Sequence, residues 1–222
     1  MCGRYCLSVE RTELEAAFGV PAPDDHHPRF NIAPSQHAPI LRQGTSTLEM
    51  SNMRWGFARQ SAQQDRSKLL INARCETVTE LPSFAPSMDK HRCLVPATGY
   101  YEWVDRGARR QPILFRPQHG SLLLFAGLWR QDPTDPEAEF TILTTEANPR
   151  VAAFHHRMPL MVTRQQQTSW LDPAVEGEEL VQELIAASAA AELSSQAVSL
   201  FVNKASHEGP ECWHQDPQSS LF

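Results

Sequence analysis

The second residue of the chain, Cys2, combines a reactive side chain with a position that could give it a second reactive group. A small residue at this position favours removal of Met1, and removal would place a thiol and a free α-amine on one residue. An α-amine has a pKa of about 7.7–8.0, so part of it is neutral at cellular pH, and the thiolate is the nucleophilic form of sulfur. Together the two groups can capture an aldehyde: the amine forms a Schiff base and the thiolate closes a five-membered thiazolidine ring.

Three polar clusters interrupt otherwise apolar segments, and each has an ordinary explanation when taken alone. Glu102 could lie on an exposed strand face, Asn72 and Arg74 could share a solvent-facing side, and a histidine pair is common in loops. Taken with Cys2, the clusters supply a carboxylate to move protons, a histidine to protonate a departing oxygen, an asparagine to orient the amine and arginines to hold phosphate. The clusters are residues 71–76, 99–103 and 154–159.

Composition and charge narrow the class of protein. The chain has 222 residues, 41% of them hydrophobic, which suits one domain with a sizeable core. Its net charge of −6 argues against non-specific coating of duplex DNA. Residues 54–74 nevertheless hold five basic residues against one acid, which fits either a basic face on an acidic body or a solvated loop.

Several classes of partner are not expected. The longest apolar run, residues 122–129, is too short to cross a membrane, and no secretion signal is visible, so we expect a cytoplasmic protein. Five cysteines without a Cys-x-x-Cys pair predict neither a disulfide framework nor a metal site, and no cofactor is implied. No pattern indicates an oligomer, so we expect a monomer.

Hydrophobic periodicity predicts short elements in an α+β fold. Residues 12–18 form a helix with capping-box spacing between Thr12 and Glu15 and with Gly19 at its end, and a second helix covers 178–190. We expect a single domain over residues 1–222, with a mainly antiparallel, curled, barrel-like sheet, a few short peripheral helices and a loosely packed polar tail over about 205–222. Residues 21–39 are predicted to be loop, and strands are predicted over 69–73, 93–97, 100–104, 122–130 and 140–145.

In these residues and their surroundings the chain resembles the SOS-response-associated peptidase family, the SRAP domain that animals carry as HMCES. The resemblance runs over nearly the whole chain, and the order and number of its motifs make it specific. These motifs are Met1-Cys2-Gly3-Arg4-Tyr5, Phe30-Asn31-Ile32-Ala33-Pro34, Arg54-Trp55-Gly56, Ile71-Asn72-Ala73-Arg74 with Glu76, Arg92 to Pro96, Gly99-Tyr100-Tyr101-Glu102-Trp103, Phe125 to Trp129, Ile142 to Thr145, and His155 to Pro159.

The resemblance implies a protein that binds abasic sites in single-stranded DNA and links covalently to the ring-opened sugar, which shields the lesion. It also implies that the protein is associated with the nucleoid when it is bound to DNA. It implies that Cys2 is the nucleophile, Asn72 positions the amine and sugar, Glu102 is the acid–base carboxylate and His155 assists ring opening and reversal. His156 falls at a variable position of the motif. The residues implied for DNA contact or for lining the site are Arg4, Arg74, Arg157, Thr144, Trp55, Asn31 and Pro34.

The chain departs from the family pattern at three places. Ser61 occupies a position where the family usually has an aromatic residue that could stack on a base. Base stacking contributes roughly 1–3 kcal/mol per base in single-strand binding. Arg59, Arg66 and Lys68 could compensate by charge. Thr98 replaces a common aspartate, and Cys6 is an additional thiol that we interpret as a small buried hydrophobic residue.

Two other functions stay open at this stage. An N-terminal-nucleophile peptidase would use the Cys2 thiolate against an amide, with autoprocessing of Met1 as one outcome, but it leaves Arg74 and Arg157 without a role. A non-covalent reader of modified or single-stranded DNA would bind without needing Cys2.

Overall fold

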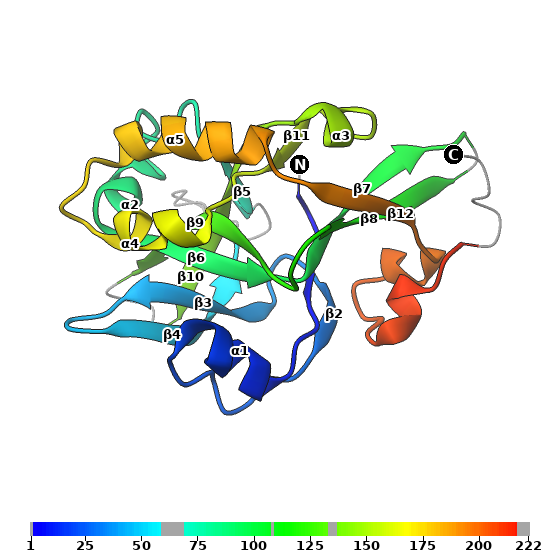
Figure 1. Cartoon of the computed structure of the whole chain (residues 1–222), viewed down its shortest axis with the longest axis horizontal. Coiled ribbons are helices and arrows are strands. Elements are labelled where there is room, and N and C mark those ends of the chain that lie inside the picture. Colours follow the sequence, from blue (N-terminus) through cyan, green and yellow to red (C-terminus); the bar gives the residue numbers. More distant parts are fainter. Residues whose placement is uncertain (1, 59–68, 108, 133–136, 217–222) are drawn as a thin grey trace.

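Two β-sheets pack face to face in the computed structural model, which describes residues 2–58, 69–107, 109–132 and 137–216 (Figure 1). The five-stranded sheet has the order β12-β8-β7-β1-β2, and all its neighbours are antiparallel. Its strands are β1 (Tyr5–Leu7), β2 (Arg29–Ile32), β7 (Gly99–Asp105), β8 (Arg110–Pro117) and β12 (Leu193–Ala197).

The seven-stranded sheet has the order β11-β10-β4-β3-β6-β9, with β5 beside β10. It curls until β10 pairs with β9 as well as with β4, and β10 runs parallel to β4 and β5. Its strands are β3 (His37–Gln43), β4 (Leu48–Trp55), β5 (Asn72–Arg74), β6 (Arg92–Ala97), β9 (Leu123–Gln131), β10 (Ala138–Glu146) and β11 (Arg157–Pro159).

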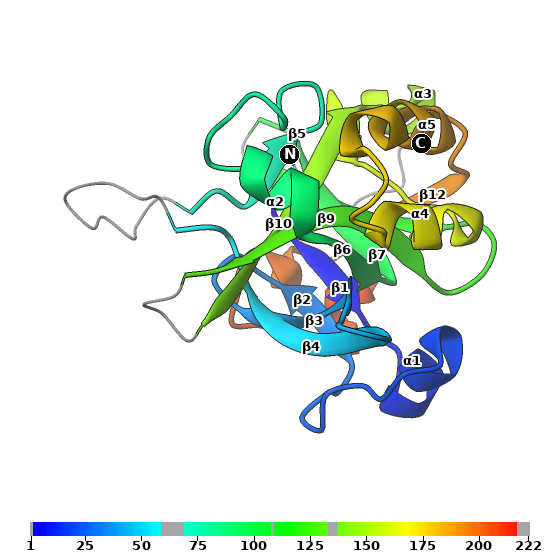
Figure 2. The ribbon, with the colours of Figure 1, turned by 90° about the vertical axis from the view of Figure 1, so that its left-hand side faces the viewer.

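Short helices cover the outer faces. Helices α4 and α5 lie side by side on one side of the sheets, and α1 lies on the opposite side (Figures 1 and 2). The α-helices are α1 (Arg11–Phe18), α2 (Ala85–Lys90), α3 (Pro149–Ala152), α4 (Gln167–Leu171) and α5 (Gly177–Ala189), and the 3-10 helices are η1 (Arg164–Gln166), η2 (Leu200–Asn203) and η3 (Pro210–Trp213).

The principal core lies between the two sheets. Tyr5, Tyr100 and Phe115 of the five-stranded sheet meet Trp55 and Phe125 of the seven-stranded sheet, and all five are fully buried. Burial of this apolar area, at about 25 cal/mol per Å², is the main term that holds the sheets together. A second cluster joins the seven-stranded sheet to α2, α4 and α5, and a third joins the outer face of β7 to the C-terminal segment.

The predicted fold class is confirmed: one α+β domain with a curled, mainly antiparallel arrangement and short helices, although the sheets do not form one closed barrel. Helix α1 ends at Gly19, whose φ of 70° suits glycine, as the sequence predicted. Its capping box, however, joins Glu10 and Glu13, so the helix begins one residue earlier than expected and Thr12 and Glu15 do not cap it.

Three predictions about local structure were wrong. Residues 21–39 are not all loop, since β2 and the start of β3 lie within them. The polar tail is not loose over its first part, because residues 205–216 pack against β2 and β7. β1, β4, β8, β11 and β12 were missed, because they alternate weakly in hydrophobicity or are short.

Among the described residues, no helix has the length and apolar character that spanning a membrane would require. All five cysteines are free and buried, and Cys6 is fully buried, as its interpretation as a small hydrophobic residue required.

Candidate active site

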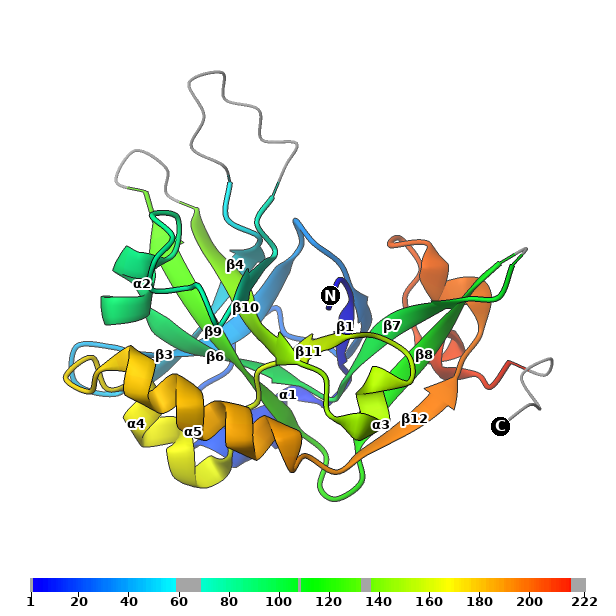
Figure 3. The ribbon, with the colours of Figure 1, turned by 90° about the horizontal axis from the view of Figure 1, so that it is seen from above.

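Strands β1 and β7 place Cys2 beside Glu102. Tyr5 of β1 pairs with Tyr100 of β7, and the amide of Tyr101 donates to the Arg4 carbonyl at 3.0 Å, so the chain before β1 runs alongside Glu102. Figure 3 shows the start of β1 between β10 and β11 on one side and β7 and β8 on the other. Cys2 is fully buried and belongs to the core between the sheets.

Glu102 is buried because the face of β7 that carries it packs against the seven-stranded sheet. Its side chain lies on the same face as that of Tyr100, toward the seven-stranded sheet, and only 4% of the residue is exposed. The explanation by an exposed strand face is therefore wrong. The C-terminal segment covers the other face, where Tyr101 lies.

Asn72 reaches Cys2 from β5, which is held by parallel pairing with β10. Its side-chain amide donates to the Cys2 carbonyl at 2.8 Å. Its side-chain oxygen is buried with no hydrogen-bond partner among the residues that the structure describes. Asn72 thus fixes the backbone of Cys2 and keeps one acceptor available for a group that enters the site.

His155 approaches Glu102 from the turn between α3 and β11. Its Nδ1 lies 3.8 Å from Glu102 Oε1, and it also lies 2.9 Å and 3.0 Å from the backbone oxygen and nitrogen of Arg157. The backbone contacts orient the imidazole with Nδ1 toward β11. Four segments far apart in the sequence thus bring together Cys2, Asn72, Glu102 and His155.

Burial sets the protonation of these groups. It raises the pKa of Glu102 to about 7, so this carboxyl can both give and take a proton near neutral pH. Burial, with the nearby Glu102 charge, raises the pKa of the Cys2 thiol, which is therefore protonated at rest. Burial also lowers the pKa of His155, which favours the neutral imidazole.

Arg157 is held by protein groups. Its guanidinium makes a two-pronged ion pair with Glu76, at 2.7 Å and 2.9 Å, and donates to the Thr144 carbonyl at 2.6 Å. Only 8% of its side chain is exposed, and Thr144 is fully buried. Arg74 lies on β5, which also pairs with β10, and it is exposed, so its guanidinium is the accessible one. Sequence reasoning missed the role of Glu76, although its position two residues after Arg74 in the same motif was the available signal.

Arg4, Asn31 and Trp55 form the support of the site. Arg4 donates to Asn31 Oδ1 at 2.7 Å and to the Val202 carbonyl at 2.9 Å. Trp55 is fully buried and donates to the Ile71 carbonyl at 2.9 Å, next to Asn72. Asn31 and Trp55, like Thr144, are fully buried, so none of the three exposes its side chain at the surface in this conformation.

The basic stretch 54–74 does not form a continuous charged face over its described part. Arg54 pairs with Glu137 at 2.6 Å and also with Glu139, and Arg130 joins Glu139 at 2.8 Å. This neutralises Arg54. The predictions for Arg59, Ser61, Arg66 and Lys68 lie outside the described residues.

Thr98, the second departure from the family pattern, fits its surroundings. Its hydroxyl accepts from the Ser8 amide at 3.1 Å and donates to Cys6 at 3.5 Å. Thr98 thereby links β1 to the strand that carries Glu102. Among the described residues, no group of three or more histidine, cysteine, aspartate or glutamate side chains could hold a metal ion.

Comparisons with known proteins agree with this fold and these motifs. The family model described as SOS response associated peptidase (SRAP) matches residues 1–205, so the chain belongs to this family. It is 31% identical over 219 residues to the Bacillus subtilis abasic site processing protein YoqW, covering 95% of this chain and 98% of that protein. It is 29% identical to the abasic site processing protein HMCES of Gallus gallus, covering 96% of this chain and 77% of that protein.

The fold also matches solved structures. A crystal structure of a protein from Bacteroides thetaiotaomicron superimposes with a TM-score of 0.81 at 22% identity, covering 97% of this chain and all of that one. A protein from Bordetella bronchiseptica superimposes with a TM-score of 0.76, also at 22% identity, covering 90% of this chain and 100% of that one.

Proposed function

We propose that this protein captures abasic sites in single-stranded DNA by forming a covalent thiazolidine with the ring-opened sugar through Cys2, after Met1 is removed. The observation that carries the proposal is the convergence of Cys2, Asn72, Glu102 and His155 from four segments. The names of the relatives, which are abasic site processing proteins, support the same substrate.

The residues divide the chemistry among them. Asn72 holds the Cys2 backbone and offers its oxygen to the freed amine. The amine attacks the aldehyde carbon, and two protons reach the departing oxygen through His155: one that the amine nitrogen loses and one that the Glu102 carboxyl gives up. Water then leaves and a protonated Schiff base remains. Glu102, with a pKa raised to about 7 by burial, then accepts the thiol proton as sulfur attacks the imine carbon. The same transfers in reverse would release the DNA, which makes the activity lyase-like and self-reversing.

The surface beside the site sets the contacts with DNA. Arg74 is the exposed arginine next to Asn72 and is proposed to hold a phosphate. Arg157, fixed by Glu76 and Thr144, is proposed to contribute its positive charge to the same groove. Arg4 is half-buried and is proposed to contact a phosphate only at the edge of its guanidinium. The reaction as proposed needs one chain and no cofactor.

Intact mass tests the proposal. The purified protein is incubated with a single-stranded oligonucleotide that carries one abasic site, then denatured and weighed. The expected adduct is lighter by one water than protein without Met1 plus oligonucleotide. Cys2→Ala should give no adduct, whereas Cys6→Ala, which removes the nearby thiol that faces the C-terminal segment, should give the full amount.

The outcomes separate the alternatives. An adduct that persists in Cys2→Ala would refute the mechanism. No adduct from wild-type protein that has lost Met1 would favour a peptidase or a non-covalent DNA reader, and binding that survives Cys2→Ala without any covalent product would select the reader.

A further inference from the structure

Two tyrosine hydroxyls are buried without partners in the core next to Cys2. Tyr5 and Tyr100 stand directly opposite each other in the β1–β7 pairing, and both are fully buried. Neither hydroxyl has a hydrogen-bond partner among the residues that the structure describes. A buried hydroxyl left unpaired costs on the order of 1–3 kcal/mol, so a pair of them at one place needs an explanation.

The next tyrosine along β7 shows that this is not a general feature of the strand. The Tyr101 hydroxyl, on the other face of β7, donates to the Phe30 carbonyl at 2.7 Å and accepts from Trp213 Nε1 at 2.9 Å. The unpartnered hydroxyls therefore belong to one face only, the face that carries Glu102.

That face is the floor of the proposed active site. Tyr100 and Glu102 are two residues apart on one strand and point the same way. Cys2, Tyr5 and Tyr100 belong to one buried cluster. Burial raises the pKa of both phenols, and the charge of a Cys2 thiolate would raise it further.

The buried thiol needs a donor when it reacts. In the resting structure its partner is the Arg4 carbonyl, which lies 3.8 Å from the sulfur and can only accept. Burial, Glu102 and more weakly Cys6 all disfavour the thiolate, while the α-amine of a processed Cys2 would favour it. Phenols whose own pKa is raised keep their protons at neutral pH and remain hydrogen-bond donors there.

We propose that Tyr5 and Tyr100 form a hydroxyl pair that donates hydrogen bonds to the Cys2 sulfur as it becomes a thiolate, and that they thereby promote closure of the thiazolidine ring. This inference rests on the proposed function and concerns its second step. The S–H bond breaks and its proton passes to the Glu102 carboxylate. A sulfur electron pair forms the C–S bond to the protonated imine carbon, and the C=N π pair returns to nitrogen. The phenols keep their O–H bonds throughout.

Substitution by phenylalanine removes only the hydroxyls. Tyr5→Phe and Tyr100→Phe keep the rings that pack on Trp55, Phe115 and Phe125, so the fold is retained. Each variant, and the double variant, is mixed with abasic single-stranded DNA and quenched at intervals with borohydride. Reduction of the open Schiff base adds two hydrogens, whereas the closed ring is not reduced, so intact mass counts both species over time.

The expected result is a defect confined to ring closure. Imine formation proceeds as in the wild type, ring closure slows about tenfold in each single variant and further in the double variant, and its pH profile moves to higher pH. Tyr101→Phe is the matched control: it removes two hydrogen bonds on the opposite face and should leave the ring-closure profile unchanged.

Three outcomes would overturn the inference. They are ring closure at the wild-type rate in both single variants, equal slowing of imine formation and ring closure, and the same shift in Tyr101→Phe. Failure of the proposed function would look different, because the wild-type protein would then form no adduct.

Discussion

Glu102 carries a proton equilibrium that affects both stability and chemistry. Its pKa is raised by burial from 4.5 to about 7 in the folded protein. Between these values the folded protein holds a proton that the unfolded chain has released. The free energy of unfolding should therefore fall as the pH rises from about 4.5 to about 7, and the loss is complete above that range.

Glu102→Gln tests this at the residue scale. The amide keeps the size of the side chain and cannot ionise, so the variant should be more stable than the wild type at pH 8, by on the order of 1–3 kcal/mol, and similar to it at pH 4. Urea unfolding at the two pH values measures the difference. Crosslinking to abasic DNA should be slowed strongly, because the proton acceptor is lost. A variant less stable than the wild type at pH 8 would show that the charged carboxylate is stabilised by its surroundings.

The strands that position the site could be predicted only in part, for physical reasons. Strand β9 and the apolar parts of β6 and β10 can be predicted from their continuous apolar sequence, because both of their faces are buried. The motif around Glu102 located β7, yet periodicity could not show that its second face is covered by residues 200–216. The pairing of Arg157 with Glu76 links residues 81 apart, and no local pattern encodes such a partner.

Gly99 shows how an element holds the site. It begins β7, three residues before Glu102, and a Cβ at this position would lie 2.6 Å from the Phe115 carbonyl of β8. Backbone atoms cannot yield as a flexible side chain can, so Gly99→Ala must push β7 away from β8. We expect a loss of about 1–3 kcal/mol in unfolding free energy and slower crosslinking.

Gly44→Ala is the control for this prediction. The three atoms nearest to a Cβ at Gly44 all belong to the Glu49 side chain, which is 43% exposed and can move aside. Chemical denaturation and the crosslinking rate are measured on both variants. Equal stability of Gly99→Ala and the wild type would mean that β7 and β8 tolerate a wider separation, and that the site does not depend on their close packing.

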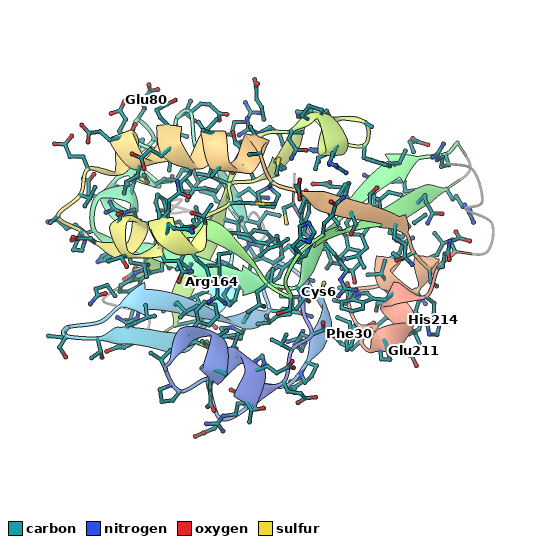
Figure 4. All side chains as sticks on the ribbon, in the orientation of Figure 1. Cys6, Phe30, Glu80, Arg164, Glu211 and His214 are labelled. Atoms are coloured by element: carbon teal, nitrogen blue, oxygen red, sulfur yellow. The ribbon has the colours of Figure 1, made fainter. Side chains whose placement is uncertain are left out.

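At the scale of the whole molecule, β2 near the start of the chain is joined to residues 202–207, far along the sequence. The Asn31 side-chain amide donates to the carbonyls of Val202, Lys204 and His207, at 3.2, 2.9 and 2.7 Å. In Figure 4 Phe30 lies next to the segment that carries Glu211 and His214. Because these contacts join residues more than 170 positions apart, composition could not reveal them, and the polar composition of the tail predicted loose packing instead.

Trp213 is the main anchor of this C-terminal segment and gives the last prediction. Its ring meets Phe30 edge to face at 4.9 Å, lies 4.4 Å from the Arg116 guanidinium carbon, and donates its N–H to the Tyr101 hydroxyl. Trp213→Ala removes all three contacts and leaves the outer face of β7 partly uncovered. We expect a loss of about 2–4 kcal/mol in unfolding free energy. Crosslinking should slow as well, because the Val202 carbonyl that holds Arg4 belongs to the same segment.

Glu211→Ala, an exposed change two residues away, should stay within about 0.5 kcal/mol of the wild type. Trp213→Phe should fall between the two, since the ring contact remains and the hydrogen bond is lost. Urea unfolding of the three variants measures the order of their unfolding free energies. If Trp213→Ala unfolds like Glu211→Ala, the C-terminal segment adds little to stability, and the packing between the two sheets is enough to hold β7 in place.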